Sequence, residues 1–408
     1  MIDTPREPPP AGARDLCLWL AVQAAHDAGL IKRLVHDYGS FEKVVRQPRR
    51  QLAAKVRDHA GAPAGSATMP GTGVDEAVVT WADDDYPRQL DDLYDPPPAL
   101  FLRGARLRSL LRALSVRPTV AVVGARRPSP YGLEMAGLLG AGLVRAGVNV
   151  VSGVALGVDA AAQVEAVRQL ADHRQAAGLR DVAGVARAGV PAVAVVGVLG
   201  GGVRLVAPRT NARLFDAIAT HGLLLSEYGW DLPPAPWRFP ARNRVIAALA
   251  RATVIVEGRS TSGALHTAAF ALDMGRDVLA VPGEAGRPLA AAPHKLLRDG
   301  AHLCESVDDV LALLPDGPWR HGLAGEDPAG VGAAAQVGDC GVAGLDESSP
   351  EGRVRAALER GPHTPDQLIE STHLAPQRVM AALSLLEIAG SAERMAGGRY
   401  RLARGSAP

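Results

Sequence analysis

The sequence predicts an α/β fold, in which a parallel β-sheet is covered by helices on both faces. Six short runs rich in Val, Ile and Leu alternate with segments of helical length, as in successive β-α-β units. The runs are continuously apolar rather than alternating, as expected of strands buried on both faces. The predicted strands are Thr119–Gly124, Val148–Ser152, Ala192–Gly197, Leu223–Glu227, Thr253–Glu257 and Asp277–Val281.

Composition limits the class of protein. A chain of 408 residues with 47% apolar and 21% charged residues is typical of a soluble globular protein of two or three domains. The 44 basic and 43 acidic residues nearly cancel, which excludes a protein that binds polyanions over its whole surface. Any nucleic-acid site must therefore be a local concentration of positive charge.

The remaining composition predicts a cytoplasmic protein. Cys17, Cys304 and Cys340 are far apart and form no CxxC pair, so neither a metal site nor a disulfide framework is predicted. The first ten residues, MIDTPREPPP, do not resemble a signal peptide, and no apolar stretch is long enough to cross a membrane.

Four regions are expected along the chain. Residues 1–80 hold short helices, marked by apolar positions such as Leu16, Leu20 and Leu34, followed by a Gly/Pro-rich linker at Pro63–Gly73. Residues 81–315 form the sheet domain, which opens on a polar turn region at Trp81–Gly104. Residues 316–349 lack periodicity and predict a flexible linker.

Residues 350–408 have the outline of a winged helix-turn-helix. Helical patterns at Arg353–Arg360, Asp366–Ser371 and Pro376–Ala389 precede a predicted hairpin with Gly397-Gly398 at its turn. The expected recognition helix, Pro376–Ala389, carries one arginine against one glutamate, which is poor for a strong DNA reader. A protein contact and a weak auxiliary DNA contact both remain open.

The first candidate site is the turn after the first sheet strand, VAVVGARRPSPYG (Val120–Gly132). Gly124 would let the backbone approach a phosphate, Arg126 and Arg127 lie in the turn, and Ser129 is expected to cap the next helix. The turn lacks the GxGxxG pattern, which disfavours a nicotinamide cofactor. A tight turn with solvated arginines is an equal alternative.

The second candidate is VSGVALGVDAA (Val151–Ala161). Ser152, Gly153 and Gly157 surround the start of a helix, an arrangement that suits an anion held by backbone amides. Glycines at a strand-to-helix turn also serve close packing alone, so this alternative stays open.

The third candidate is the segment Leu225–Leu249, in which four prolines accompany three closely spaced arginines, Arg238, Arg242 and Arg244. Three guanidinium groups within seven residues repel one another, and a polyanion would relieve that repulsion. Trp237 or Phe239 could stack on a base, and Asn243 lies between two of the arginines. The alternative is internal pairing with the nearby carboxylates of Glu227, Asp231 and Glu257.

The fourth candidate is Glu257–Gly283, where Ser262 and Gly263 open a helix and could hold a further phosphate. His266 stands alone in that helix without a triad pattern. No H-E-x-x-H, G-x-S-x-G or Walker sequence is present, so the sequence predicts no catalytic residue, no metal and no cofactor.

Together these segments resemble the DNA-processing protein A (DprA, also called Smf) family. The matching pieces occur in family order over roughly Trp81–Leu314, and FPARNR with the preceding Ser-Glu is the most specific. They are Tyr86–Gly104, Val120–Gly132, Val151–Ala161, Ser226–Leu249, Ser262–Gly283 and Leu296–Leu314.

The resemblance implies an extended Rossmann-like domain whose positive pocket holds single-stranded DNA, with a SAM-like N-terminal segment. It also implies delivery of that DNA to the RecA recombinase during natural transformation, and a homodimer. The assignment of Arg127 and Arg238 to the DNA site rests only on their charge and on their position beside the family's motifs. The positions that match the family's pocket motifs are Gly124, Arg126, Ser152, Gly153, Arg242, Asn243, Arg244, Ser262 and Gly263.

The chain also departs from the family pattern. Gln163 stands where the family usually has His, a helical insertion is expected near residues 172–189, and Ala290–Lys295 replaces a G-x-N stretch. The enzymatic alternative is a nucleotide phosphoribohydrolase of the lysine-decarboxylase-like group. Val281–Glu284 is only a fragment of that group's PGGxGTxxE pattern.

Overall fold

The computed structural model describes the chain at residues 8–27, 29–53, 55–56, 74–176, 193–317, 350–361 and 363–372, and at 374, 376, 378–379, 382–383, 386, 392–394 and 399–402. The chain divides into two compact units, Met1–Glu326 and Asp327–Pro408. The expected linker at Pro63–Gly73 lies outside the described residues, as do residues 177–189 of the expected insertion and 318–349 of the second linker.

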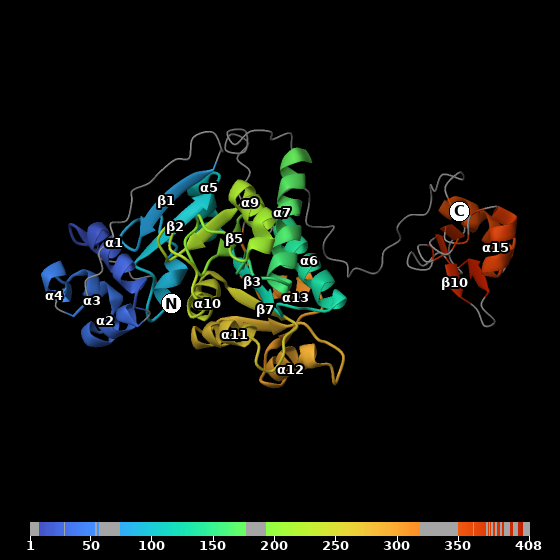
Figure 1. The fold of residues 1–408 in the computed structure, drawn as a ribbon. Coiled ribbons are helices and arrows are strands. Elements are labelled where there is room, and N and C mark those ends of the chain that lie inside the picture. Colours follow the sequence, from blue (N-terminus) through green and yellow to red (C-terminus); the bar gives the residue numbers. More distant parts are fainter. Residues whose placement is uncertain are drawn as a thin grey trace. The chain divides into compact units, whose positions relative to one another are not determined.

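Short helices precede the sheet and pack against its edge. Leu20 and Leu34 are fully buried among them, and the ring of Phe41 meets the ring of Trp81 edge-to-face at 5.4 Å. These contacts attach the helices to the sheet, and Figure 1 shows the helices, in blue, beside strands β1 and β2. The helices are α1 (Ala13–Ala24), α2 (Leu30–Tyr38), α3 (Phe41–Val45) and α4 (Arg49–Ala53).

The sheet of the described residues has nine strands in the order β1-β2-β6-β5-β4-β3-β7-β8-β9. The strands from β6 to β9 in this order are parallel, whereas β1 and β2 form an antiparallel edge. All six predicted strands are present. The strands are β1 (Asp75–Thr80), β2 (Ala99–Gly104), β3 (Thr119–Gly124), β4 (Asn149–Ser152), β5 (Val195–Val198), β6 (Leu223–Ser226), β7 (Ala252–Val256), β8 (Asp277–Ala280) and β9 (His302–Leu303).

Three strands were not predicted. Strand β1 lies in the region assigned to the N-terminal segment, and β2 lies in the region interpreted as a polar turn. Strand β1 is an edge strand whose residues vary between exposed and buried, so it lacks the continuous apolar run that marks a central strand. Strand β9 has only two residues, too few for a periodic signal.

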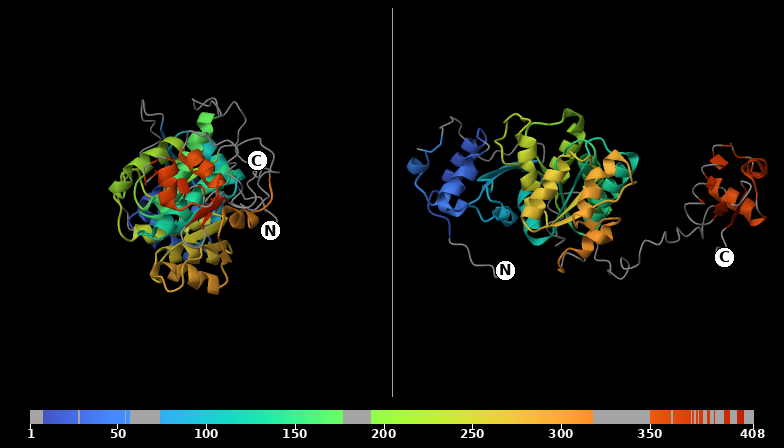
Figure 2. Two further views of the ribbon diagram at one scale, coloured as in Figure 1. Left: turned by 90° about the vertical axis from the view of Figure 1, so that its right-hand side faces the viewer. Right: turned by 90° about the horizontal axis from the view of Figure 1, so that it is seen from below.

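Two apolar cores explain the continuous runs. In β3, Val120 and Val122 join the core beneath α6 and α7, whereas Ala121 and Val123 join the core beneath α10 and α11. Both faces of the sheet are therefore covered, as Figures 1 and 2 show. The α-helices that follow β2 in this unit are α5 (Leu107–Val116), α6 (Pro130–Arg145), α7 (Val158–Ala176), α9 (Ala212–His221), α10 (Arg238–Leu249), α11 (Ala264–Asp273), α12 (Ala291–Arg298) and α13 (Val307–Ala312). The described residues of this unit also form three 3₁₀ turns, η1 (Arg88–Asp92), η2 (Arg209–Asn211) and η3 (Pro288–Ala290).

The strand order reverses direction beside β3. From β3 the chain builds outward through β4, β5 and β6, and then returns to β7 on the other side of β3. In open α/β sheets the loops diverge at such a point and leave a crevice at the carboxyl ends of the strands. The loops after β3 and β7 are therefore the place to look for a site.

The second unit has its own small core. Helices α14 (Pro350–Glu359) and α15 (Pro365–Thr372) pack around Val354, Leu358 and Leu368, and β10 (Ala392–Arg394) pairs with β11 (Tyr400–Leu402). The turn at Gly397-Gly398 and most of the expected recognition helix Pro376–Ala389 lie outside the described residues.

Among the described residues, none of the helices combines the length and apolar character that a membrane crossing requires.

Candidate nucleic-acid interface

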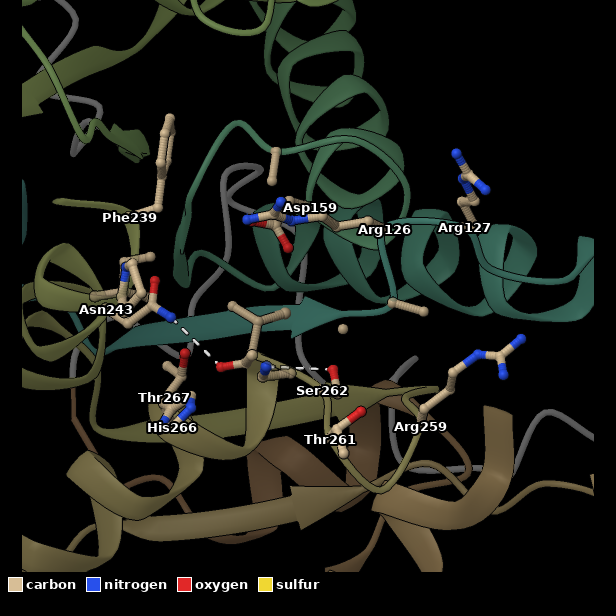
Figure 3. A pocket seen from close by; sticks show the side chains of 18 of the residues that line it. Arg126, Arg127, Asp159, Phe239, Asn243, Arg259, Thr261, Ser262, His266 and Thr267 are labelled. Atoms are coloured by element: carbon tan, nitrogen blue, oxygen red, sulfur yellow. Dashed lines mark hydrogen bonds between the residues drawn. The ribbon is translucent and has the colours of Figure 1, made fainter. Parts of the chain in front are cut away.

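A cavity of about 360 Å³ opens at the carboxyl ends of β3 and β7, where the strand order reverses. Its walls come from the turn after β3, the turn after β7 and the first turns of α10 and α11 (Figure 3). The lining residues with functional side chains are Arg126, Arg127, Asp159, Phe239, Arg242, Asn243, Arg259, Thr261, Ser262, His266 and Thr267.

The turn after β3 brings two exposed guanidinium groups to this cavity. Arg126 and Arg127 are both exposed, and Figure 3 shows Arg126 lying across the pocket near Asp159 while Arg127 extends outward. Gly124 lines the cavity, and a Cβ there would lie 1.8 Å from the carbonyl oxygen of Val256. Glycine is thus required where β3 and β7 separate.

The loop after β4 builds the wall but does not present its polar groups to the cavity. The Ser152 hydroxyl donates to the Val122 carbonyl at 2.7 Å, and the Gly153 amide donates to Asp159 Oδ2 at 3.0 Å. Gly157 has a φ of 83°, the left-handed conformation that favours glycine. The interpretation as anion ligands is corrected for Ser152 and Gly153, whose polar groups are engaged within the chain, and none of the three residues lines the cavity.

Arg242 lies at the base of the cavity and is held by backbone carbonyls. Its Nη1 donates to the carbonyl oxygen of Gly153 at 2.7 Å and also to that of Val198. Burial lowers the pKa of Arg242 to about 10, and the nearby charge of Asp159 opposes that shift. Burial likewise raises the pKa of the Asp159 carboxyl, with the Arg242 charge acting against it. The expectation of a guanidinium free to clamp phosphate is corrected here, because its side chain is 4% exposed and already bonded.

Arg244 points away from the cavity. Its Nη2 lies 2.7 Å from Glu227 Oε2 and its Nε lies 3.4 Å from Asp95 Oδ2, in a separate cavity on the other side of α10. Residues 242 and 244 are 200° apart around a helix, so they cannot share a face. The expectation that the three arginines form one cluster is therefore wrong, and the internal pairing with Glu227 is present instead.

Arg238 and Trp237 also lie outside the cavity. Arg238 donates to the carbonyls of Pro233 and Ala25, and its guanidinium stacks 5.0 Å from the ring centres of both Tyr228 and Trp237. Trp237 lines the same separate cavity as Arg244. The two other carboxylates offered as partners bind elsewhere: Asp231 pairs with Arg204, and Glu257 accepts from Ser129.

The start of α11 completes the cavity as expected. Asn243 Nδ2 donates to the Gly263 carbonyl at 3.5 Å, and the Ala264 amide donates to Ser262 Oγ at 3.3 Å, both drawn in Figure 3. Gly263 is exposed and has open space where a Cβ would point. Phe239 also lines the cavity, so the predicted residues that the structure brings together there are Gly124, Arg126, Arg127, Phe239, Arg242, Asn243, Ser262 and Gly263.

The sequence interpretation missed Arg259. This exposed arginine lies in the turn after β7, as Arg126 lies in the turn after β3, so the same rule applied to both turns would have found it. Figure 3 shows Arg259 extending outward like Arg127. His266, also exposed, lines the cavity as well.

The cavity is thus a crevice of positive charge. Its exposed cations are Arg126, Arg127 and Arg259, and of the described residues that line it only Asp159, which is buried, carries a carboxylate. Within the described ranges, no group of three or more His, Cys, Asp or Glu side chains is placed to bind a metal ion. Guanidinium groups beside a helix start suit phosphate oxygens.

Comparison with known proteins agrees with this geometry. Residues 77–315 match the family model of DNA recombination-mediator protein A, and residues 343–398 match the model of the DprA winged helix domain. The chain is 35% identical over 232 residues to DNA processing protein DprA of Bacillus subtilis, covering 57% of this chain and 69% of that one.

Two further matches span more of the chain. Protein Smf of Synechocystis is 34% identical over 340 residues, which covers 79% of each chain. The X-ray structure of DNA processing protein A from Streptococcus pneumoniae superposes with a TM-score of 0.52 at 26% identity, covering 77% of this chain and all of that one. The first family model spans every residue that lines the positive cavity.

Proposed function

The chain belongs to the DNA recombination-mediator protein A (DprA/Smf) family, and we propose that it binds single-stranded DNA without reading its sequence and passes the strand to a RecA recombinase. The observation that carries the proposal is the crevice ringed by Arg126, Arg127 and Arg259 at the point where the strand order reverses. The net charge of the whole chain is only +1, so this local cluster must supply the attraction for phosphates.

The size of the crevice favours a single strand over a duplex. A volume of about 360 Å³ admits a phosphate with a sugar or base, whereas a duplex would need an extended groove-reading element. Phe239 offers one ring at the wall, and stacking on a ring tolerates every base because each has a π-face. Binding is therefore expected to be independent of sequence.

The proposal includes the partners and the setting. A RecA recombinase is the proposed recipient of the strand, which the family's role as a recombination mediator supports. A second copy of the chain is the proposed partner in a homodimer, and the protein is proposed to act in the cytoplasm as a binder without a cofactor and without catalytic activity. Among the described residues, the free thiols of Cys17 and Cys304 suit a reducing compartment.

The test measures the affinity of the full chain for a labelled single-stranded oligonucleotide and for the matched duplex over a series of salt concentrations. We expect tighter binding to the single strand and a linear fall of log affinity with log salt. Equal affinity for the duplex, or no dependence on salt, would contradict the proposal. A second measurement follows RecA filament formation on DNA coated with single-strand-binding protein, which the chain should accelerate.

A further inference from the structure

Glu257 holds an unusual position directly after β7. Its φ is 54°, the left-handed region that a residue with a side chain rarely adopts, and its side chain is buried. Such a conformation persists only where surrounding contacts stabilise it, and it marks a residue whose placement matters.

The stabilising contacts are at the start of α6, the helix that follows β3. Glu257 Oε2 accepts a hydrogen bond from the Ser129 amide at 2.8 Å, and Oε1 accepts one from the Ser129 hydroxyl at 2.5 Å. Ser129 is the N-cap of α6, and its hydroxyl in turn accepts from the Gly132 amide at 3.2 Å. One carboxylate therefore meets both donors of the capping residue.

Gly132 shows how closely the carboxylate sits against the helix. A Cβ at residue 132 would lie 2.3 Å from Glu257 Oε2, so only glycine leaves room for the carboxylate there. The start of the helix after the strand at the switch point is where doubly wound nucleotide binders hold a ligand phosphate. In this chain that position is already filled by a negative group.

A large cavity adjoins the filled position. It has a volume of about 650 Å³, is lined mainly by apolar residues such as Tyr131, Pro282 and Leu289, and has Glu257 in its wall. The volume would admit a nucleotide. A ligand phosphate entering there would meet the carboxylate of Glu257 instead of the amides of α6.

We propose that Glu257 is a specificity-determining residue whose carboxylate takes the place of a ligand phosphate at the start of α6 and keeps free nucleotides out of the adjoining cavity. Of these two cavities in the described part of the chain, the arginine-lined crevice is then the one that accepts phosphates, which suits the backbone of a long strand. A second consequence rests on the proposed function: by fixing Ser129, Glu257 holds the turn that carries Arg126 and Arg127.

The experiment removes the carboxylate from the full chain. Glu257→Gly eliminates it and also suits the left-handed backbone, and the measurement is the thermal transition with increasing inorganic pyrophosphate or ATP. The Glu257→Gly protein and the protein that keeps Glu257 both carry Arg126→Ala, Arg127→Ala and Arg259→Ala, so that the crevice contributes little to anion binding. We expect the transition of the Glu257→Gly protein to rise with added anion, with an affinity at least about tenfold above that of the protein that keeps Glu257.

Ser129→Ala is the matched control, because it weakens the cap while Glu257 still fills the position. This variant should show no response to pyrophosphate. If Glu257→Gly unfolds without ligand, added pyrophosphate should restore its transition, which supports the proposal equally. A Glu257→Gly protein that neither responds to nor is rescued by anions overturns it.

A second experiment tests DNA binding, with Glu257→Gly as the only substitution. We expect a several-fold loss of affinity for a single-stranded oligonucleotide, and unchanged affinity would overturn the positioning role. If the unmodified chain binds no oligonucleotide, the proposed function fails, whereas the pyrophosphate result still decides whether Glu257 excludes anions.

Discussion

Arg244 Nη2 lies 2.7 Å from Glu227 Oε2 at the end of β6, and the two side chains are 13% and 12% exposed. Burial alone would lower the pKa of Arg244, but the charges of Glu227, Asp95 and Tyr228, together with the hydrogen bond to Glu227, outweigh it and raise that pKa. Burial raises the pKa of Glu227, and Arg244 opposes the change. The pair is a structural contact between β6 and α10, on the opposite side of α10 from the positive crevice.

We predict that Arg244→Ala destabilises the fold. The substitution leaves the Glu227 carboxylate buried without its partner, which typically costs about 3–5 kcal/mol. Urea denaturation checks the value. Replacing both residues by Met should cost less than Arg244→Ala, because no charge is left buried. If Arg244→Ala keeps full stability yet loses DNA binding, the arginine contacts the strand after all.

Removing an exposed arginine of the crevice should weaken DNA binding and leave stability unchanged. Arg126→Ala, Arg127→Ala and Arg259→Ala should each lower the affinity for a single strand several-fold, and each lost phosphate contact should reduce the salt slope by about 0.7. Arg168→Ala is the matched control, since Arg168 is 70% exposed on α7 and does not line the crevice. If all four variants lose the same affinity for single-stranded DNA, the net charge of the protein, and not the crevice, accounts for binding.

Two glycines of the crevice should respond in opposite ways to Ala. Gly124→Ala would place Cβ 1.8 Å from the Val256 carbonyl, so we expect a loss of about 3 kcal/mol or more in thermal unfolding. Gly263→Ala meets open space, so its stability should change by less than about 0.5 kcal/mol. If a phosphate lies against that backbone, Gly263→Ala should still weaken strand binding, and unchanged affinity would place the phosphate elsewhere.

The buried thiols predict a loss of stability at high pH. Burial raises the pKa of Cys17 and of Cys304 from 9.0 to about 12. Their contribution is fully present below pH 9.0, where the unfolded thiols stay protonated, and is lost as the pH rises toward 12. Denaturation at increasing pH should show a shallower decline for the Cys17→Ala, Cys304→Ala protein than for the unmodified chain. If stability falls equally with pH in the two proteins, the buried thiols do not cause the decline.

The secondary structure could be predicted most fully where a single physical cause determines the residue pattern. Within the run Thr119–Gly124, the four residues Val120–Val123 alternate between two apolar cores, so all four are apolar and the strand is predictable without its neighbours. Strand β2 pairs with β6, more than a hundred residues away, and no local pattern reports such a pairing. The same limit applies to Glu257, whose partner Ser129 is 128 residues distant.

Within the site, the turn after β3 was the most predictable part, and the arginines of α10 were the least predictable. The positions of Arg126 and Arg127 could be predicted from the end of β3, because a short turn allows few directions for its side chains. The arginines of α10 depend on the phase of that helix relative to the sheet, and charge spacing alone does not give the phase. Counting about 100° per residue from Phe239 would have placed Arg242 about 60° away and Arg244 about 140° away, and so separated Arg244 from the crevice once that one facing residue was known.

The reversal of strand order beside β3 also bears on synthesis of the protein. The crevice joins the turn that begins at Gly124 to the start of α11, and β4, β5 and β6 are synthesised between them. A nascent chain that has left the ribosome only as far as β6 has a single wall of the crevice. Binding of single-stranded DNA should therefore appear in one step, late in synthesis, once α11 has folded. If the chain is divided after β6 and the two parts are expressed separately, DNA binding should require their reassociation.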